Sequence, residues 1–132
     1  MDIAAFSLIV QIFVLAIILL GYIYFRRKNL WLHGVLLVIA TAIYSAAIFT
    51  IMVPLFLASP QNYIPNLGIV GIGNSFHIVL GCISEILAVF ISARWIINRF
   101  DSRGCAGKEL MRLTMLLWLA SLLSGILTYF VF

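Results

Sequence analysis

Charge is the scarcest property of this sequence. Only 9% of its 132 residues are charged, whereas 65% are hydrophobic and the mean hydropathy is +1.23. Soluble domains typically carry about 25% charged and about 45–50% apolar residues. A chain of this size cannot hide so much apolar surface from water. The composition therefore excludes a soluble fold and indicates that lipid is the surrounding solvent.

The sequence also lacks the motifs of several enzyme and binding classes. It has no Gly-rich phosphate loop, no zinc-type cysteine spacing and no Ser/His/Asp set with a soluble cleft. No disulfide is expected, because Cys82 falls within an apolar run and Cys105 in a polar loop at a different depth. Cys105 is interpreted as a plain loop thiol, and a role as a ligand stays open. The acidic start of the chain does not predict a signal peptide.

Long apolar runs are what the sequence has in place of charge. Such runs favour helices over the alternating segments of a membrane barrel, so the sequence predicts an all-α integral membrane bundle. We expect one transmembrane domain over residues 1–132, with four helices at about 3–25, 30–57, 71–97 and 113–132. Each helix is long enough to cross the roughly 30 Å of hydrocarbon in a bilayer.

The distribution of basic residues predicts the orientation of the helices. Seven of the eight basic residues lie in the first and third loops, and the second loop has none. Because positive charge marks the cytoplasmic side, we expect loops 1 and 3 to be cytoplasmic and both termini to be non-cytoplasmic. The net charge of +4 is thus explained by topology in the cell membrane, not by nucleic acid. Aromatic residues near the cytoplasmic interface are interpreted as belt anchors, namely Tyr22, Tyr24, Trp31 and Trp95.

Polar and small residues recur at helical spacing on the predicted helices. The third helix carries one such stripe at His77, Gly81, Ser84, Glu85, Ala88 and Ser92. The second helix carries a comparable stripe at His33, Leu37, Ala40, Thr41, Tyr44 and Ile48. Polar side chains in a membrane usually face the interior of the bundle, so these stripes are expected to face one another.

The two histidines are predicted at opposite faces of the membrane. His33 and His77 are separated by roughly 20 Å along the membrane normal, so one subunit cannot use both on one metal or haem iron. Met52 is available at the depth of His77, and Met111 and Met115 at the depth of His33. Histidine and methionine form an acceptable axial pair for haem iron and also suit copper. A parallel homodimer, or histidines simply hydrogen-bonded within the bundle, are the alternatives.

Glu85 is predicted near the membrane centre, at about the depth of Tyr44. A lone carboxyl group is costly there and is expected to stay neutral and bonded to a partner such as Tyr44, Ser45 or Ser121. Its functional interpretations are proton transfer, contact with a headgroup or quinone, or an interface with a second membrane subunit.

A set of short motifs carries a family resemblance. They are His33-Gly34, Phe76-His77-Ile78-Val79-Leu80-Gly81, Trp95, Met111-Arg112, Leu117-Trp118-Leu119, and Gly125 with Tyr129. Over roughly residues 32–132 the chain resembles small four-helix membrane proteins that include assembly factors for haem-copper oxidases. It is also similar in style to b-type membrane cytochromes. The resemblance implies that His33 and His77 correspond to membrane histidines of that family, although the family's further histidine has no counterpart between Lys108 and Arg112.

These observations lead to three hypotheses of different classes. The first is a small redox protein of b-type cytochrome character in an electron-transfer chain, with haem b held by His33 and His77 together with Met52, Met111 or Met115. Glu85 and Tyr44 would then handle a proton or contact a ligand. The second is a haem-free accessory subunit or assembly factor of a respiratory membrane complex. The third, an ion conduit, lacks a second charge at the midplane, and whether the protein is an enzyme stays open.

Overall fold

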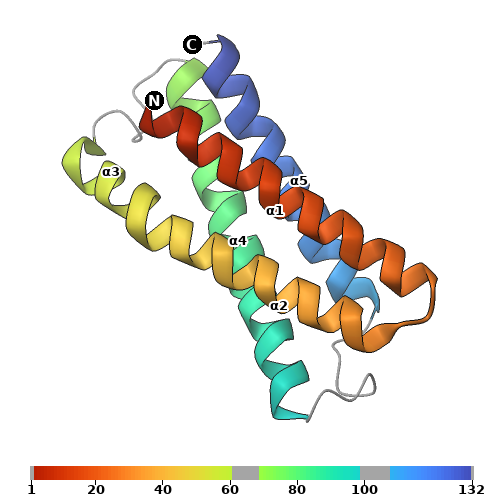
Figure 1. Ribbon diagram of the computed structural model, residues 1–132. Coiled ribbons are helices and arrows are strands. Elements are labelled where there is room, and N and C mark those ends of the chain that lie inside the picture. The colour runs from red at the N-terminus through yellow and green to blue at the C-terminus, as the bar shows by residue number, and fades with distance from the viewer. Residues whose placement is uncertain (1, 61–68, 99–107, 132) are drawn as a thin grey trace.

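The chain forms an all-α bundle of four apolar helices. The computed structural model describes residues 2–60, 69–98 and 108–131. Its elements are α1 (Ile3–Arg26), α2 (Leu30–Ala47), a π-helical turn (Ile48–Met52), α3 (Val53–Ala58), α4 (Ile69–Ile97) and α5 (Lys108–Val131). The segment from α2 to α3 is one continuous span, Leu30–Ala58. Among the described residues, four helices are thus long and apolar enough to cross a membrane, which confirms the predicted all-α four-helix bundle (Figure 1).

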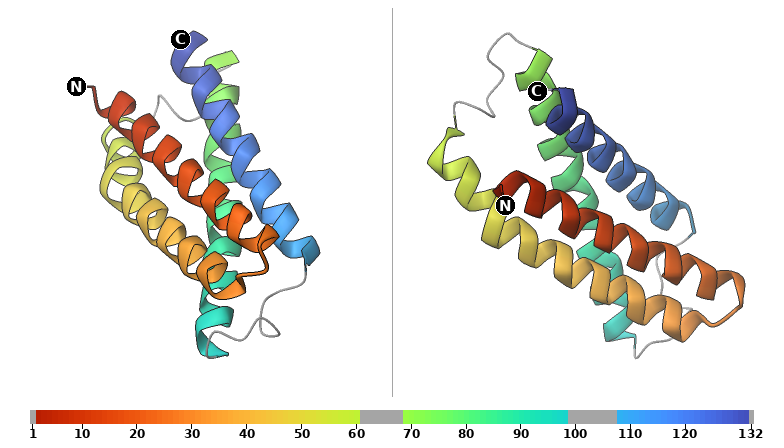
Figure 2. Two further views of the ribbon diagram at one scale, coloured as in Figure 1. Left: turned by 45° about the vertical axis from the view of Figure 1, so that its right-hand side comes forward. Right: turned by 45° about the horizontal axis from the view of Figure 1, so that its top comes forward.

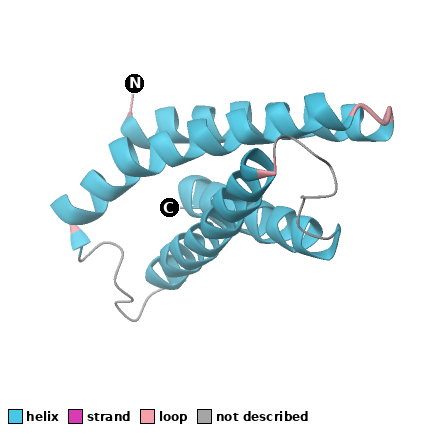
Figure 3. Ribbon diagram, turned by 90° about the horizontal axis from the view of Figure 1, so that it is seen from below, coloured by secondary structure: helices cyan, strands magenta, loops and turns pink. Residues whose placement is uncertain are grey.

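The four helices pack as two antiparallel pairs. The closest backbone contacts join α1 to α2 and α4 to α5. Fewer backbone contacts join α2 to α4, and very few join α1 to α5. Figure 2 shows each pair side by side in both views, and Figure 3 shows the two pairs as two layers. The bundle is therefore held within each pair more tightly than between the pairs.

A tight turn brings α1 back along α2. Lys28 has a φ of 60°, a left-handed conformation that commonly ends a helix. Its amide donates to the carbonyl of Phe25, and the amide of Asn29 donates to that of Tyr24. The side chain of Asn29 then accepts a hydrogen bond from the amide of Leu32, which caps the start of α2. The basic loop is thus a compact helical hairpin.

Pro54 explains why the second span widens into a π-helical turn before it ends. Proline has no amide to donate and its ring crowds the preceding turn, so the regular hydrogen-bond pattern cannot continue through it. The turn Ile48–Met52 lies directly before this residue, at the start of α3. Such π turns absorb the mismatch without interrupting the helix.

The fourth helix begins earlier than predicted. We expected it from about residue 113, but α5 begins at Lys108. Lys108, Glu109 and Leu110 are good helix formers, and hydropathy marks where lipid begins, not where a helix begins. The smaller differences elsewhere are of the same kind, since α4 begins at Ile69 and α1 continues to Arg26. The predicted end at Phe132, and Cys105, lie outside the described residues.

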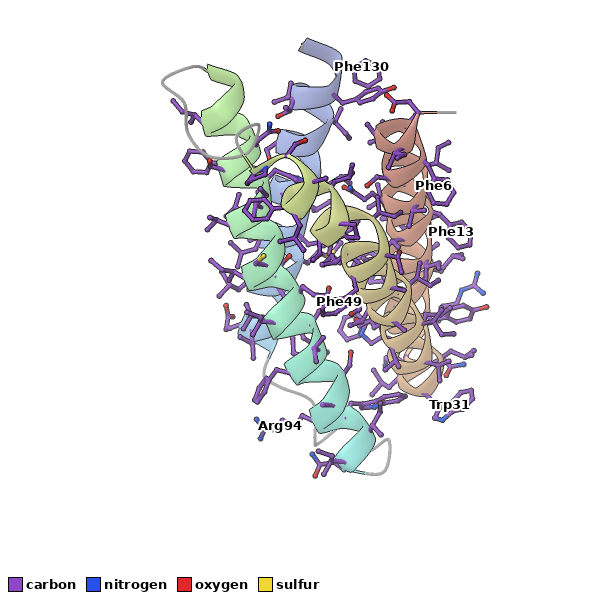
Figure 4. All side chains as sticks on the ribbon, turned by 90° about the vertical axis from the view of Figure 1, so that its left-hand side faces the viewer. Phe6, Phe13, Trp31, Phe49, Arg94 and Phe130 are labelled. Carbon is purple, nitrogen blue, oxygen red and sulfur yellow. The ribbon has the colours of Figure 1, made fainter. Side chains whose placement is uncertain are left out.

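Large apolar side chains cover the outside of the bundle. Figure 4 shows Phe6 and Phe13 pointing from α1 away from the other helices, and Phe13 is 57% exposed. Phe130 on α5 is 73% exposed. A surface of this kind is stable only in lipid, which supports a multi-pass membrane protein.

The core lies where the two pairs meet. Buried residues from α1, α2 and α5 form one cluster, namely Val14, Ile17, Ala40, Tyr44, Trp118 and Leu122. The rings of Tyr44 and Trp118 lie edge to face, with centroids 6.0 Å apart. This contact across the bundle ties α2 to α5 near the middle of the spans.

Candidate functional site: a cavity between the helix pairs

A cavity of about 440 Å³ separates the two helix pairs. All four long helices line it, with α1 and α2 on one side and α4 and α5 on the other. The lining residues are Val14, Ile18, Tyr22, Phe25, Arg26, His33, Leu37, Ala40, Thr41, Tyr44, Ser84, Glu85, Ala88, Ile91, Ser92, Met111, Arg112, Thr114, Met115 and Trp118. Ligand sites in proteins commonly have volumes of about 300–1,000 Å³, so this cavity can hold a small organic molecule.

The cavity has a cationic end. Arg26 stands in the last turn of α1 and Arg112 near the start of α5, and both line the cavity. Arg112 forms an ion pair with Glu109 at 3.8 Å, in which both side chains are largely exposed. The sequence pattern explains these arginines by topology alone. Whether both line one cavity depends on how α1 and α5 pack, and the spacing of residues does not determine that packing.

His33 lies at the same end of the cavity. Its Nδ1 is 2.8 Å from the carbonyl oxygen of Gly21, across the α1–α2 pair. A carbonyl oxygen only accepts, so Nδ1 carries the proton and the lone pair of the neutral ring is on Nε2. The ring of Phe25 packs at a tilt against the imidazole, with centroids 5.2 Å apart. Histidine ligands of metals commonly bond one ring nitrogen to a backbone carbonyl and coordinate through the other nitrogen. His33 has this arrangement, with Nδ1 bonded to Gly21 and Nε2 left for coordination.

Met111 and Met115 face the same cavity as His33. They stand one turn apart on α5, which places both thioethers on one side of the helix. The structure therefore brings together three of the predicted ligand candidates from α2 and α5. Their donor set, one imidazole and a thioether, is one that haem iron accepts.

Glu85 and Tyr44 line the deeper part of the cavity. The hydroxyl of Ser45 on α2 donates to Oε1 of Glu85 on α4, so the carboxyl group has one of the partners predicted for it. The hydroxyls of Tyr44 and Ser121 both lie close to Gly81 on α4. Polar side chains from α2, α4 and α5 therefore meet at the deeper part of the cavity, where the Ser45–Glu85 hydrogen bond joins α2 to α4.

His77 occupies different surroundings from His33. Its Nδ1 donates to the carbonyl oxygen of Ser121 at 2.7 Å, and the Ser121 hydroxyl donates to the carbonyl of His77 at 2.9 Å. Its ring packs against Gly125, where an added Cβ would come within 2.8 Å of ring atoms. His77 is not among the residues that line the cavity, and neither is Met52. Through these hydrogen bonds His77 joins α4 to α5.

Trp95 departs from its predicted role. We interpreted it as an anchor at the membrane interface, but it is only 4% exposed and lies inside the bundle. Its indole packs against Gly34 on α2. The sequence shows Gly34 next to His33, but it does not show that the ring of Trp95 fills the space beside this glycine.

Two further comparisons bear on a metal or a known family. Within residues 2–60, 69–98 and 108–131, no group of three or more His, Cys, Asp or Glu side chains is placed to hold a metal ion. No protein-family model, curated protein or solved structure matches the chain.

Proposed function

We propose that this protein is a small redox protein of b-type cytochrome character in the cell membrane, and that its cavity holds haem b. The observation that carries the proposal is the convergence of His33, Met111 and Met115 on one cavity with two arginines at its end.

The residues around the cavity fit such a group. His33 would hold the iron through Nε2, and Met111 or Met115 would hold it through the thioether sulfur. The walls are otherwise mostly apolar and include Trp118 and Ile91. Bound haem would supply one-electron chemistry, while the protein sets its potential through the ligands and the polarity of the walls. Glu85 and Tyr44 are the groups that would exchange a proton or contact a carrier.

The proposal includes an orientation. Arg26, Arg27, Lys28 and Arg112 lie at the end of the bundle where α1 meets α2 and α5 begins. Positive charge favours the cytoplasmic side, so the cationic end of the cavity would face the cytoplasm and the termini the opposite side. In a parallel homodimer the His77 side chains of the two copies would lie at the same depth. They would then form a pair of histidines, as would the two copies of His33.

An absorption spectrum of the protein, purified in detergent from haem-replete cells, tests the proposal. We expect a Soret band that shifts on reduction with dithionite. The band should be lost in His33→Ala and weakened or shifted in Met111→Leu or Met115→Leu, whereas His77→Ala should retain it. A colourless wild-type protein that cannot be loaded with haem contradicts the proposal. A band lost in His77→Ala but kept in His33→Ala would contradict its placement in this cavity.

The weak packing between the helix pairs favours a second candidate, a haem-free accessory subunit or assembly factor. The backbones of α1 and α5 come close at few positions, so a helix of a respiratory membrane complex could pack against both. Copurification of colourless protein with such a complex would distinguish this function from the first.

A further inference from the structure

The cavity is polarised along its length. Its cationic end carries Arg26 and Arg112, and its deep end carries Glu85, Tyr44 and Trp118. On α1 the lining extends from Val14 to Arg26, which corresponds to about 18 Å along the helix axis. The walls between these ends are mostly apolar. A ligand that matches this pattern has an apolar body and a negative group at one end.

The two arginines are available to a ligand. Arg112 is paired with Glu109, but an ion pair between such exposed side chains is weak. Within the described part of the chain, no acidic side chain pairs with Arg26. A carboxylate held between Arg26 and Arg112 would be attracted by both guanidinium groups, and hydrogen bonds between such charged partners are stronger than neutral ones.

We propose that the cationic end of the cavity is a carboxylate site. Arg26 and Arg112 would hold the carboxylate of an amphipathic ligand whose apolar body extends toward Trp118 and Tyr44. Guanidinium groups suit this task because their paired N–H donors match the two oxygens of a carboxylate. This inference rests on the proposed function in treating the same cavity as the ligand site, and it adds the chemical class of the ligand.

Two sources share this chemistry. Haem carries carboxylates on one edge of an apolar ring, and a fatty acid carries one at the end of an apolar chain. The shared feature is the free acid, and methyl esters of both compounds remove it while keeping the apolar body. Comparing each acid with its ester therefore isolates the contribution of the arginines.

The experiment measures the affinity of the ligand-free protein, in nonionic detergent, for haemin, haemin dimethyl ester, oleate and methyl oleate by calorimetric titration. At least one acid should bind about tenfold or more tightly than its ester. Arg26→Gln and Arg112→Gln should each reduce that preference several-fold. The matched controls are Arg27→Gln, one residue beyond Arg26, and Arg94→Gln, which Figure 4 shows on the side of α4 away from α1 and α2. Neither control residue lines the cavity, so both variants should keep the preference.

The outcomes separate this inference from the proposed function. Haemin binding with a preference over its ester supports both. Oleate binding with that preference, together with no binding of either haemin form, supports the carboxylate site and contradicts the haem function. Equal binding of haemin and its ester, unchanged in the arginine variants, overturns the carboxylate site and leaves the haem function standing. Failure of all four compounds to bind overturns both. Gel filtration and circular dichroism of each variant verify that it is folded.

Discussion

The indole ring of Trp95 lies directly against the backbone of Gly34, in the space where any other residue would place its Cβ. An added Cβ at position 34 would come within 2.5 Å of ring atom Cε2 of Trp95. This contact joins α2 to α4, two helices from different pairs whose packing is looser than the packing within each pair. Close approach through a glycine is a common way for membrane helices to pack, because van der Waals contact drives their association in lipid.

Gly34→Ala is expected to destabilise the bundle. The methyl group would displace a rigid, buried ring, and overpacking of this kind typically costs about 1–3 kcal/mol. Thermal unfolding in detergent should show a lower midpoint. Gly21→Ala is the control, because an added Cβ there would meet its neighbours at 3.7 Å or more. Equal stability of the two variants would show that the Gly34 contact does not limit the packing of α2 on α4.

Ser121→Ala should loosen the contact between α4 and α5. The Ser121 hydroxyl donates to the carbonyl of His77 on α4, so the variant loses a hydrogen bond between the two helices. Hydrogen bonds between membrane helices contribute about 0.6 kcal/mol on average, and the expected loss is about 1 kcal/mol. Ser124→Ala is the control, since its hydroxyl bonds only within its own helix, to the carbonyl of Ser121. If Ser124→Ala lowers stability as much as Ser121→Ala, the interhelical bonds are not the cause.

Glu85→Gln should fold as well as the wild type, whereas Glu85→Leu should be less stable. The amide oxygen of glutamine can still accept the hydrogen bond from Ser45, but leucine leaves that hydroxyl without this acceptor. Unfolding midpoints in detergent compare the two variants. A Gln variant as damaged as the Leu variant would mean that the structure needs a carboxyl group as such.

Cysteine labelling tests the orientation inferred from the basic loops. In a chain without native cysteines, Lys28→Cys and Ser59→Cys place single thiols at opposite ends of the α2–α3 span. A membrane-impermeant maleimide added to intact cells should modify position 59 and not position 28, and both should react after the cells are opened. Preferential labelling of position 28 in intact cells would reverse the topology.

Local sequence properties accounted for much of the fold. Continuous apolar runs identified four spans, because the cost of exposing backbone polar groups to lipid leaves helices as the solution for each run. Helical spacing placed Glu85 and Tyr44 on interior faces, and the partner Ser45 was among those expected for Glu85. The same reasoning set Met111 and Met115 at the depth of His33. Each of these inferences needs only the residue types and the rise of a helix.

What the sequence by itself determined is therefore the number of helices, their apolar character and the faces that carry polar groups. Only the tertiary structure decided that the pairs α1–α2 and α4–α5 diverge around a cavity, that Arg26 and Arg112 meet at its end, and that Trp95 lies inside. Lipid is as apolar as the helix surfaces, so burial of apolar area does not select which helices meet. That choice depends on shape, such as the fit of Trp95 on Gly34 and of His77 on Gly125, and those partners are far apart in sequence.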